Sequence, residues 1–176
     1  MPDSPILGFY RGERPDDRGR SLTAMQSWDD DRLEIVHDYI QWLFPLPERS
    51  AFNPGAPLLT PADMEAFKND AGLRDRLLAS FRRLLAFYGF ALDQRAERPT
   101  ITPAANLSAR TGAWLHQGNH NLLRLTRILR CLTLLGFPEH ARAFLAALER
   151  LDAEQPGRVG ATAMRYWRDA VRAHPG

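Results

Sequence analysis

The sequence predicts an all-α protein, a single-domain irregular bundle of about six or seven helices joined by proline-rich connections. Apolar residues recur every three or four positions over most of the chain, the spacing that places side chains on one face of a helix. Proline and glycine separate these stretches, and no segment is a credible sheet strand beyond a brief extended piece at Thr100 to Thr102. A length of 176 residues is close to that of one domain.

The first twenty residues are predicted to form a loosely ordered arm that precedes a helical domain at residues 21–174. They are rich in Pro, Gly, Arg and Asp, a composition that buries too little apolar area to offset the entropy of ordering. A few apolar residues in the arm could attach it to the domain, namely Ile6, Leu7, Phe9 and Tyr10.

One continuous helix is predicted from Asp29 to Phe44. Asp29 is a suitable N-cap, and Pro45 ends the helix. The apolar positions cover about half of the circumference, so we expect this helix to pack on two sides. They include Leu33, Ile35, Val36, Tyr39, Ile40, Trp42 and Leu43.

Two helices are predicted after the proline-rich connection. Thr60 is a suitable N-cap with Pro61 at the first helical position, for a helix that continues through Asn69. The next helix covers residues 73–88 and ends at Gly89, a residue type that favours the helix C-terminus.

The C-terminal half is predicted to hold the centre of the bundle. Residues 93–113 lack sustained periodicity and are expected to form a long loop or a short helix. Residues 119–135 are apolar around most of the helix circumference, which makes them the expected central helix. Gly136 ends it, Pro138 opens another helix, and a last helix contains Trp167.

Composition excludes several functional classes. The net charge is +2, with 23 basic and 21 acidic residues spread along the chain, so no dense basic run indicates a nucleic-acid partner. The single cysteine, Cys131, excludes an internal disulfide and a thiolate-rich metal site. No stretch resembles a signal peptide or a transmembrane segment, so a cytoplasmic location is expected by default, and no cofactor is indicated.

Two polar features lie on the predicted central helix. Arg124 projects among apolar residues, and a buried guanidinium needs an acceptor, either a structural ion pair or a bound anion. Asn119, His120 and Asn121 stand at the helix start, where free backbone N–H groups favour anions, and Arg127 follows two turns later. Alternatively, the asparagine at the N-terminus of this helix only caps the helix and binds no ligand.

A third feature is the aromatic run that contains Tyr39, Gln41 and Trp42. Aromatic side chains at helical spacing are more often part of a core than of a ligand site, whereas Gln41 is the polar exception.

No catalytic motif is present, so we expect a protein that is not an enzyme. There is no glycine-rich phosphate loop, no nucleophile elbow, and no histidine pair with metal-binding spacing. Two alternatives stay open: an enzyme that uses His120 with Asp38 or Glu34, and a nucleic-acid-binding domain that uses Arg124, Arg127 and Arg130.

Several segments resemble the conserved domain of the opioid growth factor receptor (OGFr) family. The strongest are residues 39–45 (YIQWLFP) and 120–129 (HNLLRLTRIL), and shorter ones occur in the same order at 9–11 (FYR), 53–54 (NP), 59–60 (LT) and 87–89 (FYG). The resemblance implies a helical domain found in bacteria and animals, whose animal members are described as receptors for the peptide Met-enkephalin associated with the nuclear envelope. Because this chain stops at Gly176 without the long C-terminal extension, a bacterial-type member is expected.

Together these observations predict a peptide- or protein-binding module in which polar groups orient a ligand of unknown identity. The candidate ligand-binding residues are Gln41, Trp42, Asn53, His120, Asn121, Arg124 and Arg127.

Overall fold

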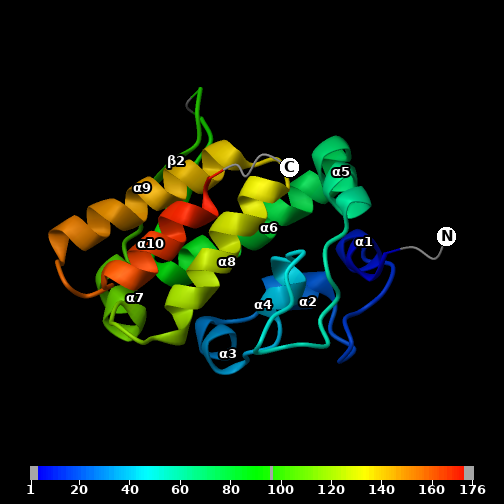
Figure 1. Ribbon diagram of the computed structural model, residues 1–176, viewed down its shortest axis with the longest axis horizontal. Helices are drawn as coiled ribbons and strands as arrows, with labels where there is room; N and C mark the ends of the chain where they lie inside the picture. The colour runs from blue at the N-terminus through cyan, green and yellow to red at the C-terminus, as the bar shows by residue number, and fades with distance from the viewer. Residues whose placement is uncertain (1–3, 96, 173–176) are drawn as a thin grey trace. The chain divides into compact units, whose positions relative to one another are not determined.

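The computed structural model describes residues 4–95 and 97–172, which divide into two compact units at Met1–Arg83 and Leu84–Gly176. The described residues form ten helices and two short strands (Figure 1). The fold is therefore mostly helical, as predicted, although it has more helices than the six or seven expected and includes a small two-stranded sheet. The single-domain organisation stays a prediction, and the predicted end of the domain at residue 174 lies outside the described residues.

The first unit contains five short helices and the beginning of a long one. Their bounds are α1 (Pro5–Arg11), α2 (Leu22–Gln26), α3 (Asp30–Ile35), α4 (Ile40–Leu43), α5 (Pro61–Asn69) and α6 (Ala71–Tyr88), whose last residues belong to the second unit.

Helix α1 forms within the twenty residues for which we predicted a loose arm. Its apolar residues are buried in the first unit: the Phe9 ring lies 5.2 Å from that of Trp42, and the Tyr10 ring lies 5.0 Å from that of Phe67. The Tyr10 hydroxyl donates to the Leu43 carbonyl. The division of the chain at residue 21 stays a prediction, while these contacts show how α1 packs.

The single helix predicted from Asp29 to Phe44 is two helices, α3 and α4, separated by residues 36–39. Asp29 caps α3 as predicted, because its side chain accepts a hydrogen bond from the Arg32 backbone N–H. The backbone then turns to an extended conformation at Val36, with ψ at 126°. Ile35, which we placed on the apolar face, is consequently 72% exposed.

Side chains from elsewhere in the first unit explain this break. The Asn53 amide donates to the Asp38 carbonyl over 3.1 Å, and the Tyr39 hydroxyl donates to the Leu33 carbonyl over 3.0 Å. The Arg20 guanidinium lies 2.7 Å from the Asp38 carboxylate. These tertiary contacts outweigh the local helical pattern, because helix propensity differences are only tenths of a kcal/mol per residue.

Helix α5 has the predicted bounds. Thr60 and Asp63 form a reciprocal capping box, and Pro61 occupies the first helical position. Helix α6 also ends as predicted, at Tyr88, although it begins two residues earlier than the expected Leu73.

The second unit is built around the predicted central helix. Its elements are β1 (Phe90–Asp93), β2 (Thr100–Pro103), α7 (Leu107–Trp114), α8 (His120–Leu134), α9 (Pro138–Glu154) and α10 (Ala161–Ala170). Helix α8 packs against both α9 and α10 (Figure 1). Leu125, Ile128 and Leu129 of α8 are fully buried, and Trp167 of α10 donates to the Leu122 carbonyl over 3.0 Å.

The two strands pair antiparallel, with Phe90 opposite Pro103 and Asp93 opposite Thr100. The extended piece at Thr100 to Thr102 is confirmed, but its pairing with β1 corrects the prediction that no sheet forms. In each strand only one residue is buried, Phe90 in β1 and Ile101 in β2. The sequence therefore lacks the alternation of apolar and polar residues that indicates a strand.

Candidate binding site

The three candidate residues of the first unit lie at α4 and the connection that follows it. Gln41 and Trp42 belong to α4, and each is only 4% exposed. The Gln41 amide donates to the Ser50 hydroxyl over 3.3 Å, and the same hydroxyl accepts from the Asn53 backbone N–H over 3.3 Å. Ser50 therefore joins Gln41 and Asn53, and we call these residues with Trp42 the α4 cluster.

Two polar atoms of the α4 cluster are buried and have no hydrogen-bond partner among the described residues. They are the Gln41 side-chain carbonyl Oε1, an acceptor, and the Trp42 indole Nε1–H, a donor. A buried polar group left without a partner destabilises the folded state by about 1 to 3 kcal/mol. Because most buried polar atoms are paired in folded proteins, two on neighbouring residues need a physical explanation.

A charged network lies beside the α4 cluster. Arg20 contacts Asp16 over 2.6 Å and Asp38 over 2.7 Å, and Arg18 contacts Asp38 over 2.5 Å. Burial favours a higher pKa for Asp38, but the hydrogen bond and charge of Arg20, with the charge of Arg18, outweigh it and hold the pKa below its usual value. Asp38 is thus an anion with two cationic partners.

The four candidate residues of the second unit lie along the first turns of α8. Asn119 caps the helix, because its side chain accepts from the Asn121 backbone N–H over 2.8 Å. Asn121 is fully buried, and its side-chain oxygen accepts from the Tyr88 hydroxyl over 3.3 Å and from Arg124 over 3.4 Å. The structure therefore brings Asn121 and Arg124 together.

Arg124 is 5% exposed, which confirms that its side chain is buried. His120 is the first residue of α8, and both His120 and Arg127 are half-buried. The capping role weighed for this helix start is confirmed for Asn119, while a role for the cluster in ligand binding stays a prediction.

Residues 3–175 match the opioid growth factor receptor (OGFr) conserved region. The chain belongs to this family. It is 39% identical over 178 residues to the opioid growth factor receptor of Homo sapiens, an alignment that covers 97% of this chain and 26% of the relative. It is also 36% identical over 145 residues to opioid growth factor receptor-like protein 1 of Mus musculus, covering 77% of this chain and 29% of that protein. No solved structure matches.

This OGFr-family chain thus spans less than a third of the length of these relatives. None of the helices in the described part of the chain has the length and apolar composition that a membrane span requires. Nor do three or more His, Cys, Asp or Glu side chains gather into a potential metal site anywhere in residues 4–95 and 97–172.

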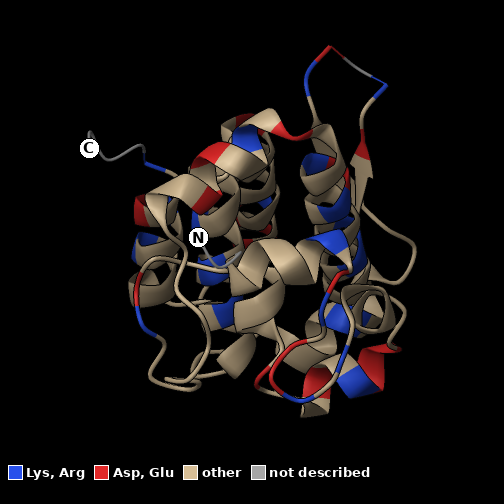
Figure 2. Ribbon diagram, turned by 90° about the vertical axis from the view of Figure 1, so that its right-hand side faces the viewer, with Lys and Arg blue, Asp and Glu red and all other residues tan. Residues whose placement is uncertain are grey.

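The charges of the family member are interspersed. Figure 2 shows both basic and acidic segments on the helices that face the viewer. The catalytic hypothesis joins His120 of the second unit to Asp38 or Glu34 of the first, and it stays a hypothesis.

Sequence reasoning missed Asp16, Arg20 and Ser50. Asp16 is 5% exposed and accepts hydrogen bonds from the Arg18 and Arg20 backbone N–H groups. These residues stand in segments whose composition indicates loops, and no periodic signal marks a loop residue that binds a distant helix. The run of opposite charges at residues 16–20, Asp-Asp-Arg-Gly-Arg, was the one available hint, and it is not specific.

Proposed function

We propose that this chain is a non-enzymatic peptide- or protein-binding module that receives its ligand at the α4 cluster. The observation that carries the proposal is the buried pair of polar atoms, Gln41 Oε1 and Trp42 Nε1, which have no intramolecular partner among the described residues. A ligand that supplies one donor and one acceptor would satisfy both atoms and recover the free energy that their burial costs.

A peptide backbone has the required chemistry. Each peptide unit offers an N–H that can donate to Gln41 Oε1 and a carbonyl that can accept from Trp42 Nε1. Burial of both atoms means that the ligand must first displace the covering residues. The hydrogen bond from the Gln41 amide to the Ser50 hydroxyl, 3.3 Å long and at the weak end of the range, would have to break for the ligand to enter.

The connection that covers Gln41 also presents an apolar contact. Phe52 is 75% exposed and lies between Ser50 and Asn53 in sequence. An exposed aromatic side chain next to buried polar groups is a typical component of a protein interaction site, because it adds apolar area to the contact.

We propose a second group of ligand contacts at the start of α8, considered within the second unit alone. Arg124 and Arg127 would supply positive charge for a carboxylate, and His120 and Asn121 would supply further polar contacts. An opioid peptide is a ligand to test, because the relatives are named opioid growth factor receptor. A cytoplasmic location is also proposed, because a chain with a single cysteine forms none of the internal disulfides that are common in exported domains.

The test is a comparison of binding and stability in the variant Gln41→Leu. Peptides are selected on the immobilised full chain from a random library displayed on phage, and Met-enkephalin is titrated separately by calorimetry. Gln41→Leu removes a buried acceptor that lacks a partner, and it also removes the 3.3 Å hydrogen bond to Ser50, so we expect the melting temperature to change little while peptide binding is lost.

The matched control is Gln94→Leu, the same change at an exposed position of the second unit. It should leave peptide binding intact. Failure to select any peptide, or a Gln41→Leu variant that loses stability and keeps its peptide, would contradict the proposal and make Gln41 a structural residue.

A further inference from the structure

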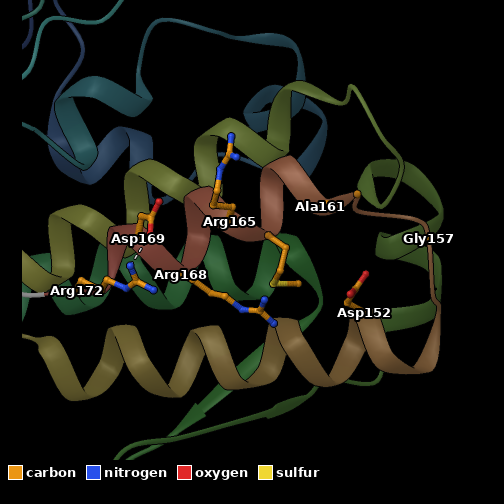
Figure 3. A pocket seen from close by; sticks show the side chains of 9 residues that line it. Asp152, Gly157, Ala161, Arg165, Arg168, Asp169 and Arg172 are labelled. Atoms are coloured by element: carbon orange, nitrogen blue, oxygen red, sulfur yellow. Dashed lines mark ion pairs between the residues drawn. The ribbon is translucent and has the colours of Figure 1, made fainter.

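A cavity lies wholly within the second unit, away from the residues of the proposed peptide site. It has a volume of about 540 Å³ and is bounded by the end of α9, the connection at Gly157 and Gly160, and one face of α10 (Figure 3). Cavities of about 300 to 1,000 Å³ are the usual size of ligand sites in proteins. The groups on its walls decide what kind of ligand it can bind.

The arginines on these walls leave no uncompensated positive charge on the side of the cavity that faces α9. Arg168 contacts Glu149 over 2.7 Å, and Arg172 contacts Asp169 over 3.2 Å, so each of these guanidinium groups already has a carboxylate partner. Figure 3 shows that Arg165 leaves α10 on the side opposite to α9. Its charge is therefore directed away from the space between the two helices.

Asp152 is the uncompensated charge on this side. It lies in the last turn of α9 and is half-buried, and its carboxylate points from α9 toward α10 and the connection at Gly157 (Figure 3). Asp152 makes no ion pair or hydrogen bond within the part of the chain that the structure describes. With the pair of Arg168 and Glu149 neutral, the α9 side of the cavity carries one net negative charge, which a cation would complement.

The helix ends at the cavity do not change the sign of this charge. The C-terminus of α9 and the N-terminus of α10, at Ala161, both contribute to the walls. A helix carries a partial negative charge at its C-terminus and a partial positive charge at its N-terminus, so these two contributions offset each other. The side chains therefore determine the preferred charge of the occupant.

The walls also offer an apolar surface. Met164 lines the cavity and is only 6% exposed, and Ala161 and two glycines add no polar side chain. Long cationic side chains in proteins typically lay their methylene groups on such a surface while the charged end contacts a polar group. The cavity thus combines a carboxylate with room for an aliphatic chain.

From this arrangement we propose that the α9–α10 cavity binds a primary ammonium group carried on an aliphatic chain, with the ammonium on the Asp152 carboxylate and the chain on Met164. An ammonium has three N–H donors and a carboxylate only accepts, so their contact is a charge-assisted hydrogen bond. A small alkylamine and the lysine side chain of a partner protein share this chemistry. The site is separate from the α4 cluster and does not depend on the proposed peptide site.

Other kinds of occupant fit the cavity less well. An anion would have to displace Glu149 from Arg168 and would also lie near the unpaired Asp152 carboxylate. A purely apolar molecule would remove that carboxylate from water without giving it a partner, which is unfavourable. An ammonium group on an apolar chain meets neither obstacle.

The experiment is a titration of the ¹⁵N-labelled full chain at low salt, followed by the amide NMR signals of Gly157 and Gly160. One probe is n-butylamine, and the other is the peptide acetyl-Ala-Lys-Ala-amide. Their neutral counterparts are n-butanol and the same peptide with norleucine in place of lysine. We expect the charged probes to shift both glycine signals to saturation and the neutral ones to bind more weakly. Binding of butylamine alone indicates a small amine as the ligand, whereas binding of the lysine peptide as well indicates a protein side chain.

Asp152→Asn tests the carboxylate. We expect it to weaken butylamine binding by about fivefold, because the charge of one partly exposed contact is lost. The matched control is Glu154→Gln, since Glu154 is an exposed α9 residue outside the cavity and its substitution removes the same charge. The control should leave the affinity unchanged.

Arg168→Gln tests the charge balance. It leaves Glu149 without its partner, so butylamine should bind several times more tightly, whereas Arg142→Gln, which breaks the pair with Glu139 outside the cavity, should have no such effect. Equal effects of the cavity and control variants would overturn the proposal. So would glycine signals that respond to neither charged probe, or that respond equally to n-butanol. Circular dichroism of each variant verifies that the fold is intact.

Discussion

Replacing Gly89 by alanine should destabilise the second unit strongly, for two separable reasons. Gly89 has φ at +94°, in the left-handed region that costs an L-residue roughly 1 to 2 kcal/mol. A Cβ built on Gly89 would also lie 2.7 Å from the Leu107 Cα, closer than such atoms pack, and a tight 3.3 Å from the Arg110 Cβ. Because the nearest atom is backbone at the start of α7, it cannot rotate away, and such overpacking costs about 1 to 3 kcal/mol more.

The matched control is Gly118→Ala, since Gly118 has φ at +80° but a Cβ there would meet nothing within 4 Å. The difference between the two variants isolates the steric term from the conformational one. Urea unfolding gives the free energy of each variant, and hydrogen exchange read by mass spectrometry assigns the loss to the α6–β1–α7 region. A Gly89→Ala variant that loses no more stability than Gly118→Ala would refute the reasoning.

Three further results are expected. Trp167→Phe, which removes the hydrogen bond to the Leu122 carbonyl and part of a fully buried ring, should lower the unfolding free energy by about 1 to 3 kcal/mol in urea titrations. Asp38 has a lowered pKa in the folded state, so its contribution to stability is present above its unfolded pKa of about 3.9 and is lost as pH falls through the folded value. Asp38→Asn should therefore lower stability at neutral pH and flatten the acid branch of a plot of urea midpoint against pH, and an unchanged acid branch would count against the Arg20 contact. Cys131 is fully buried and burial raises its pKa, so a thiol reagent should modify it only after unfolding, and rapid labelling of the native chain would contradict this.

The helices that the sequence predicts well are those whose signals are local. The N-cap at Thr60 and the apolar surface of α8 each depend on residues that are close in sequence, and the structure confirms both. The break between α3 and α4 could not be predicted in this way. It depends on Arg20 and Asn53, which are distant in sequence from the Asp38 group that they contact.

In the candidate site too, features that depend on local sequence were predicted, and contacts between residues distant in sequence were not. Burial of Trp42 and Arg124 follows from their positions on the apolar faces of helices, and the structure confirms it. The contact of Gln41 with Ser50 could not be predicted, because the intervening connection has no regular period from which to project side-chain directions. Pairing of β1 with β2 was missed because strands of four residues with one buried side chain each resemble loop sequence.

The loop at Asp16 to Arg20 has a practical consequence for how this chain is handled. The Arg20 backbone N–H donates to the Asp16 carboxylate, which closes the loop. The Arg20 guanidinium contacts both Asp16 and Asp38, and Asp38 follows α3 in the sequence. A protein shortened to begin at residue 21 would keep the partly buried Asp38 but lose both of its cationic partners, Arg18 and Arg20. The same truncation would remove α1, whose Phe9 ring lies 5.2 Å from that of Trp42, so it would weaken both the bend and the packing on which the positions of Gln41 and Trp42 depend.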